Sequence, residues 1–463
     1  MKKLDQQKKQ FEKMTTEKVP GLIVSLGIPT IISMLVTSVY NMADTYFVSK
    51  LGTASSAAVG VVFSIMAIIQ AVGFTLGMGS GSVISRLLGE QKNEEANRVA
   101  SSGLFAALLF GVVLTVFGLV FLNPLMKLLG ASESILPHAR AYGKYILLGA
   151  PIMASSFVLN NVLRSQGKAK LAMIGLTTGG ILNILLDPLF IFTFQWGTAG
   201  AAIATLASQC VSFLILLSMF LRKKSVVHLS VKNISAKSSV YFAIIKTGLP
   251  SFCRQGLASI STVALNHSAG FYGDYAIAGM SIVSKIFMML FSVSLGIGQG
   301  YQPVAGYNYG AKKFDRVKHA IWFTFTVGLM LMTFFGVLMF FLAPQVMNWF
   351  IEDSQAAEFG TRALRWQCCS LPFITVGVMC NMTFQSIGKC WTATFLSSAR
   401  QGYFFLPLIF LLPMFFGETG VQMTQACSDI LTSLLCLPFG IRFMRFLSKE
   451  DASVPRQEEL KLP

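Results

Sequence analysis

The sequence predicts an all-α polytopic membrane protein with twelve transmembrane helices, arranged as two six-helix bundles related by pseudo-twofold symmetry along the membrane normal. Three observations predict this fold class. The chain of 463 residues is 54% hydrophobic and only 12% charged, whereas soluble domains carry about 25% charged residues. Twelve apolar stretches are long enough to span a bilayer. Landmark residues of the first six stretches recur in the last six.

The apolar stretches are taken in chain order as the transmembrane helices. They cover residues 20–46, 54–80, 98–122, 142–163, 171–195, 199–221, 242–270, 277–304, 319–343, 366–388, 393–416 and 420–441. An even number of spans puts both termini on one side of the membrane. Most of the 37 Lys and Arg fall in the loops of that side, so the positive-inside rule predicts that both termini are cytoplasmic. The net charge of +17 is therefore a topology signal, and we expect a lipid bilayer and no nucleic acid as partner.

The two halves match at a separation of 219 to 222 residues. Pro151, Asn160, Gly167 and Lys168 recur as Pro372, Asn381, Gly388 and Lys389. Each copy holds six spans and returns the chain to its starting side, so the copies share one orientation, as in one class of secondary transporters. The predicted domains are a cytoplasmic N-terminal segment (1–19), an N-lobe with helices 1–6 (20–221), a cytoplasmic linker (222–241), a C-lobe with helices 7–12 (242–447) and a cytoplasmic tail (448–463).

An aspartate lies inside the apolar stretch Gly180 to Phe192. A carboxylate at the centre of a membrane span costs roughly 2.5 to 3.5 kcal/mol, so Asp187 is expected to face protein, water or an ion. Pro188 lacks an N–H group and clashes with the carbonyl of Ile184, which predicts a bend and a free backbone oxygen. Asn183 and Asp187 are four residues apart and share a helix face. Together they outline a cation site.

Three further polar residues reach a similar depth in the outer half of the N-lobe, namely Tyr40, Asp44 and Thr205. The predicted cluster therefore contains Asp44, Asp187, Asn183, Thr205 and Tyr40. Each acidic residue also has a simpler interpretation, because Asp44 could face water at the interface and Asp187 could form a turn with Pro188 beside a water cavity. Thr205 alone could bond to a carbonyl of its own helix.

The second half lacks the two carboxylates, since Leu265 and Leu406 stand at the positions of Asp44 and Asp187. A purely structural role would be expected in both copies, so this asymmetry favours function. The C-lobe spans instead contain a candidate polar network of Arg254, Lys285, Arg400 and Asp429. Intramembrane ion pairing of Asp429 with Lys285 or Arg400 would explain it. A substrate or proton relay is the alternative.

No G-x-x-x-x-G-K-[ST] motif occurs in the sequence, which argues against ATP hydrolysis. We expect no cofactor and no enzymatic activity, because no soluble domain and no nucleophile–base constellation is visible. Transport would then run on an ion gradient. A non-transporting sensor or a membrane enzyme remains the alternative from another class.

The sequence as a whole resembles the multidrug and toxic compound extrusion (MATE) antiporters, and within them the MepA-type branch. The resemblance covers nearly all of residues 20–447. It rests on the segments Asp44 to Val48 with Leu51-Gly52, Arg164 to Gly167, Asn183 to Phe192, Gly197 to Ala204, and Gln302-Pro303 with Tyr307 to Ala311. The acidic residues that another branch of the family carries in helices 7 and 10 are absent here, where uncharged residues such as Gln385 stand.

The resemblance implies that Asp44, Asp187, Asn183, Thr205 and Tyr40 couple transport to H⁺ or Na⁺, with Na⁺ held at Asp44, Asn183, Asp187 and Thr205. It implies a monomeric secondary active transporter in the bacterial plasma membrane that exchanges H⁺ or Na⁺ for amphipathic, mostly cationic organic compounds. Bending at Pro29 in helix 1 and Pro188 in helix 5 is expected to accompany transport. A flippase of lipid-linked precursors from the same superfamily is the alternative, which the three C-lobe cations keep open.

Overall fold

The computed structural model describes residues 2–453, and the regular secondary structure of this part of the chain consists of helices, without a β-strand. Part of the predicted tail (448–463) lies outside the described residues. The helices are α1 (Lys2–Thr16), α2 (Val19–Ser49), α3 (Thr53–Gly89), α4 (Asn93–Val120), α5 (Leu122–Leu128), α6 (Leu136–Ser165), α7 (Ala169–Pro188), α8 (Gly197–Leu221), α9 (Ser238–Gly270), α10 (Asp274–Gly310), α11 (Phe314–Phe350), α12 (Ser354–Ser386), α13 (Cys390–Ser398), α14 (Phe405–Phe416) and α15 (Glu418–Ser453). Two π-helical segments, η1 (Leu189–Thr193) and η3 (Ala399–Phe404), continue α7 and join α13 to α14.

Each of the twelve predicted spans corresponds to one long helix or helix pair. In the described part of the chain, eleven spans are long and apolar enough to cross a membrane. The twelfth is α9, whose 33 residues reach about 50 Å at 1.5 Å per residue. Its lower hydropathy reflects inward-facing polar residues, among them Arg254. The twelve-helix membrane fold is thereby confirmed.

Several helices run beyond the predicted apolar stretches. For example, α3, α10 and α11 each have 37 residues, because the intrahelical hydrogen bonds of the backbone do not depend on the apolar character of the side chains. The chain between the predicted spans 319–343 and 366–388 is therefore helical to Phe350 and again from Ser354. Two helices were not predicted, the seven-residue α5 and the polar α1.

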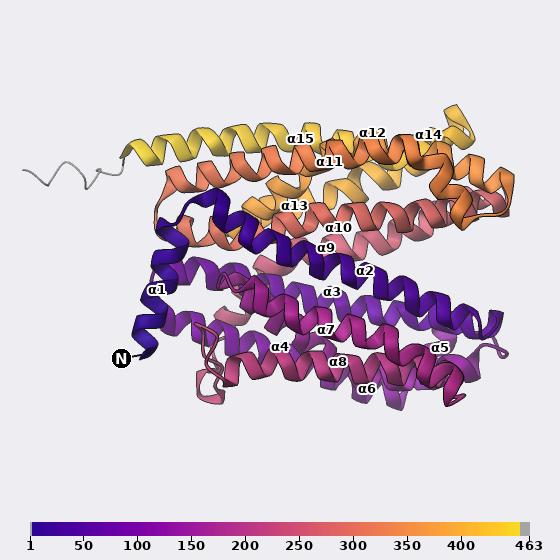
Figure 1. Ribbon diagram of the computed structural model, residues 1–463, viewed down its shortest axis with the longest axis horizontal. Helices are drawn as coiled ribbons and strands as arrows, with labels where there is room; N and C mark the ends of the chain where they lie inside the picture. Colours follow the sequence, from indigo (N-terminus) through magenta and orange to yellow (C-terminus); the bar gives the residue numbers. More distant parts are fainter. Residues whose placement is uncertain (1, 454–463) are drawn as a thin grey trace, which may run out of the picture.

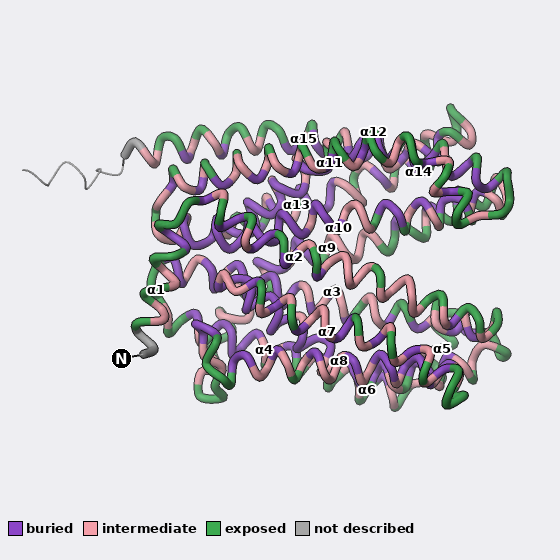
Figure 2. Tube along the Cα trace, in the orientation of Figure 1, coloured by how far each residue is buried: buried purple, intermediate pink, exposed green. Residues whose placement is uncertain are grey.

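The helices form two bundles that lie side by side, α2 to α8 and α9 to α15 (Figure 1). The most buried helix is α6 in the first and α12 in the second, which are the fourth spans of the two repeats. Peripheral helices such as α11 have exposed positions along their length (Figure 2), and these include large apolar residues such as Phe334 and Phe341. Such an apolar outer surface fits contact with lipid chains.

The repeat extends to individual hydrogen bonds. Asn160 Nδ2 donates to the carbonyl of Ala172 at 3.0 Å, and its counterpart Asn381 Nδ2 donates to the carbonyl of Ala393 at 2.7 Å. Both bonds tie the fourth span of a lobe to the start of the fifth. The two lobes are therefore copies of one helical unit, as the pseudo-twofold symmetry predicts.

The lobes meet closely at the end that carries the basic loops and diverge toward the other end (Figure 1). A Cβ atom on Gly248 of α9 would lie 1.9 Å from the carbonyl oxygen of Thr75 on α3, and one on Gly300 of α10 would lie 2.5 Å from Cα of Gly27 on α2. Only glycine permits these backbones to approach so closely. The molecule is therefore closed on its basic side.

α1 lies across this closed end. Gln10 Nε2 donates to the carbonyl of Gln166 in the N-lobe at 2.8 Å, and Asn308 Nδ2 of α10 donates to the carbonyl of Met14 at 3.1 Å. The N-terminal helix therefore bridges both lobes.

Candidate functional site

The N-lobe site is built around the amide of Asn183. Its Nδ2 donates to Asp187 Oδ1 at 3.2 Å and to Thr205 Oγ1 at 3.4 Å. All three side chains are buried, Asp187 completely. The structure thus brings together the three residues that the sequence placed at one depth on α7 and α8.

Two oxygen atoms of this group are left without a donor. Asp187 Oδ2 and Asn183 Oδ1 are buried and accept no hydrogen bond from the described residues. Buried polar atoms are almost always satisfied, because an unmade hydrogen bond costs about 1–3 kcal/mol and more at a charged group. Asp187 Oδ2 is therefore positioned to receive a proton or a cation, and Asn183 Oδ1 is positioned to bind a cation.

Helix α2 supplies Tyr40 and Asp44. Both side chains are half-buried, and Asp44 interacts electrostatically with Tyr40 and with Asp187. One oxygen of Asp44, Oδ1, is buried without a donor among the described residues. The structure brings these two residues into electrostatic range of the Asn183 group without a direct hydrogen bond to it.

Tyr142 on α6 is a member of the cluster that sequence reasoning missed. It is fully buried, it lies in electrostatic range of Asp44 and Asp187, and its hydroxyl has no hydrogen-bond partner among the described residues. The available signal was weak, since Tyr142 stands at the first position of the predicted span 142–163 and looks like an interfacial aromatic residue. Only the packing of α6 at the centre of the lobe brings Tyr142 into electrostatic range of the carboxylates.

The backbone changes form next to Asp187. α7 ends at Pro188, and the chain continues as the π-helical segment Leu189–Thr193, where the N–H of Phe194 donates to the carbonyl of Leu189 at 3.0 Å. Such π segments occur frequently at functional sites. The predicted irregularity at Pro188 is present, whereas α2 continues through the buried Pro29 to Ser49 as one helix.

The donor set suits a hard monovalent cation or a proton. The described residues contain no group of three or more His, Cys, Asp or Glu that could hold a metal ion. The oxygens of Asp44, Asn183, Asp187 and Thr205 are two carboxylates, one amide and one hydroxyl, which are ligand types of hard cations.

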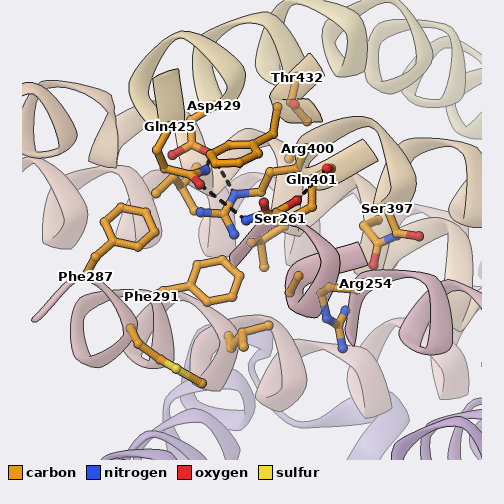
Figure 3. Close-up of a pocket in the computed structure, with 18 of the residues that line it drawn as sticks. Arg254, Ser261, Phe287, Phe291, Ser397, Arg400, Gln401, Gln425, Asp429 and Thr432 are labelled. Atoms are coloured by element: carbon orange, nitrogen blue, oxygen red, sulfur yellow. Dashed lines mark hydrogen bonds and ion pairs between the residues drawn. The ribbon is translucent and has the colours of Figure 1, made fainter. Parts of the chain in front are cut away.

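A second polar feature lies in the C-lobe, around a cavity of about 220 Å³ (Figure 3). Arg400, in the π-helical segment η3, forms an ion pair with Asp429 of α15, with Nε 2.6 Å from Oδ1. Gln425 Nε2 donates to the same oxygen at 3.0 Å, and Ser370 Oγ donates to Oδ2 at 3.3 Å. The structure thus pairs Asp429 with Arg400.

The other two basic residues of the predicted network differ from each other. Arg254 lines the cavity and lies in electrostatic range of Arg400. Lys285 is exposed and is not among the residues that line the cavity. Its grouping with Asp429 was wrong, because Lys285 lies on another face of α10. The grouping was based on the depth of each residue along its span, and depth does not show how a helix is rotated about its axis.

The fold and the site define a class of protein, a polytopic membrane transporter built from two parallel six-helix repeats. The MatE family model matches residues 29–189 and 250–411, once in each repeat, and the chain belongs to this family. The family resemblance seen in the sequence is thereby confirmed.

Individual relatives cover almost the whole chain. The multidrug export protein MepA of Staphylococcus saprophyticus subsp. saprophyticus is 27% identical over 458 residues, with 99% of both chains covered. A solved structure described as the outward-facing conformation of a multidrug resistance MATE family transporter of the MOP superfamily has a TM-score of 0.90 and 29% identity, covering 94% of this chain and 98% of that one. A MOP superfamily transporter from Pyrococcus furiosus, whose pocket polarity is described as reversed and as suggesting a different function, has a TM-score of 0.89 and 28% identity, covering 95% and 99%.

Proposed function

We propose that this protein exports amphipathic, mostly cationic organic molecules in exchange for H⁺ or Na⁺ bound at the N-lobe cluster. The observation that carries the proposal is the pair of buried oxygens on Asp187 and Asn183 that lack a donor. Relatives named as multidrug export proteins support export of drug-like molecules.

The coupling step follows from the electrostatics of the cluster. Asp44 and Asp187 repel each other when both are ionised, and burial disfavours their charged forms, so a proton or Na⁺ entering the cluster removes a large electrostatic cost. Its arrival would draw α2 and α7 together and alter the bend at Pro188 and the packing around Pro29. The shrinking N-lobe would then release the substrate.

The energy of an ion gradient is sufficient for this exchange. One charge moved through 100 mV provides about 2.3 kcal/mol, and a tenfold concentration ratio about 1.4 kcal/mol. The protein would work as a monomer in the plasma membrane of a bacterium, with both termini in the cytoplasm. Its closed basic side then faces inward, and the cluster is reached from outside.

The proposal is tested by efflux of a fluorescent cationic dye from proteoliposomes under a Na⁺ gradient and a pH gradient, imposed separately. We expect one gradient to drive efflux in the parent and neither to do so in Asp44→Asn and Asp187→Asn. Glu133→Gln, which removes an exposed acidic residue of the same lobe, is the matched control. Parental efflux in Asp187→Asn would refute the site.

A flippase of lipid-linked precursors is the second candidate, and the two arginines of the C-lobe cavity favour it because such lipids carry phosphates. The same assay separates the two functions. A flippase would not move the dye under either gradient, but it would translocate a fluorescent lipid phosphate across the bilayer.

A further inference from the structure

The geometry points to the C-lobe cavity as a binding site for an anionic group, such as the carboxylate, sulfonate or phosphate of an amphiphile. The inference rests on the proposed function, to which it adds a substrate class: molecules that carry a negative charge beside their apolar part. The cavity is separate from the N-lobe cluster and has the opposite charge.

The charges around the cavity do not balance. Its charged lining residues are Arg254, Arg400 and Asp429, which leaves one positive charge in excess. Asp429 is already engaged by Arg400, Gln425 and Ser370. In the described part of the chain no carboxylate pairs with Arg254, which sits near the middle of α9. A cation at this depth is costly unless it has a partner or a function.

Arg400 has unused hydrogen-bonding capacity as well. Its Nε is bonded to Asp429, whereas Nη2 is buried and meets no acceptor among the described residues. Arg254 also lines the cavity and lies in electrostatic range of Arg400, so the two positive charges repel each other. An anionic group in the cavity would give Arg400 Nη2 an acceptor and reduce this repulsion, and guanidinium groups bind carboxylates and phosphates through their N–H donors.

Two of the aromatic residues that line the cavity, Phe287 and Phe291, already contact a cation of the protein. The guanidinium carbon of Arg400 lies 4.4 Å from the ring centroid of Phe291 and 5.4 Å from that of Phe287. A cationic ligand that sought these ring faces would have to displace Arg400 and approach two positive charges. The rings are available to the apolar part of an anionic ligand by their edges and remaining faces (Figure 3).

The repeat places this cavity at the position of the N-lobe cluster. Ser261, Leu265 and Gln425 line it, and they stand at the repeat positions of Tyr40, Asp44 and Thr205. The carboxylate Asp44 is thus replaced by an apolar residue, and the arginines are added. The two lobes hold equivalent sites with opposite charge preference.

The test compares two fluorescent probes that differ only in a negative group, 8-anilinonaphthalene-1-sulfonate and N-phenyl-1-naphthylamine. The full-length protein is titrated in phosphatidylcholine nanodiscs. We expect Arg254→Gln to weaken binding of the sulfonate probe about tenfold, the effect of losing one charge-assisted hydrogen bond, and to change binding of the neutral probe less than about twofold. Lys285→Gln removes a C-lobe cation outside the cavity and is expected to leave both affinities unchanged.

A second variant separates loss of binding from misfolding. Arg400→Gln alone would leave Asp429 buried and unpaired, so it is combined with Asp429→Asn. We expect this double variant to bind the sulfonate probe more weakly and to unfold at a temperature near that of the parent. Equal affinities of the parent for the two probes, or no effect of Arg254→Gln, would overturn the proposal.

Competition identifies the source of the anion. Displacement of the sulfonate probe by dihexanoyl phosphatidylglycerol, but not by dihexanoyl phosphatidylcholine, supports a lipid headgroup, and failure of both to displace it supports a soluble anionic amphiphile.

Gradient-driven dye efflux that requires Asp187, together with equal probe affinities, would overturn the anion site alone. Selective sulfonate binding without gradient-driven efflux would overturn the proposed function and keep the anion site.

Discussion

Arg164 of α6 donates a hydrogen bond from Nη1 to Oε1 of Gln299 on α10, across the interface between the two lobes. Both side chains are buried, and Arg164 Nη2 also donates to Asn161 Oδ1 at 2.5 Å. On the same side, Arg86 Nη1 donates to the carbonyl of Ser386 at 2.9 Å. These bonds exist only while the lobes are closed at their basic end, so they stabilise this state over one that is open there.

Replacing Arg164 by Met should shift the protein toward the state that is open at the basic end. A buried hydrogen bond to a charged group contributes about 1.5–3 kcal/mol, so the ratio of the two states should change at least about tenfold. The measurement is the distance between spin labels at Val120→Cys and Phe350→Cys, at the outer ends of α4 and α11, with the native cysteines replaced. Arg98→Met, at an exposed position, is the control. An unchanged distance distribution would show that Arg164 does not hold the lobes together.

Gly248→Ala should have the same effect for a steric reason. The added Cβ would lie 1.9 Å from the carbonyl oxygen of Thr75, far inside van der Waals contact, so α3 and α9 must separate. Gly256→Ala on the same helix meets nothing within 4 Å and provides a matched control. We expect the spin-label distance to change only in Gly248→Ala. A change in both variants would indicate an effect of helix propensity instead of contact.

Pro188→Ala should slow transport without preventing substrate binding. Alanine restores the N–H group and permits a regular α-helix through residue 188, whereas proline inside a helix costs about 3 kcal/mol. We expect dye efflux to fall about tenfold while the dissociation constant of the dye changes less than about twofold. Pro413→Ala, which also removes a proline from a helix interior but in the C-lobe, is the control. A parental efflux rate in Pro188→Ala would exclude a conformational role for this residue.

Asn160→Leu and Asn381→Leu should destabilise the protein by similar amounts. Each leaves one carbonyl, that of Ala172 or Ala393, without its side-chain donor, which costs about 1–3 kcal/mol when the group is buried. The unfolding temperature in detergent measures the loss of stability. The affinity for the dye shows whether substrate binding is also affected. A large decrease in the unfolding temperature of only one of the two variants would show that the equivalent hydrogen bonds contribute unequally to the stability of the two lobes.

The sequence alone determined the membrane fold, the twelve spans, the repeat and most of the N-lobe cluster. These features are local or periodic: apolar length decides which segments cross the bilayer, and the spacing of Asn183 and Asp187 decides that they share a helix face. Depth along a span then sufficed to group Thr205 with them. Pro188 was informative because its effect on the backbone is independent of its surroundings.

The tertiary structure alone decided which residues of different helices meet. Tyr142 joins the carboxylates, Lys285 leaves the C-lobe network, and Arg254 and Arg400 come together at one cavity because of how each helix is rotated about its axis. That rotation is set by packing against several neighbours at once. The contact of Arg164 with Gln299 joins residues that are 135 positions apart, and no local pattern specifies it.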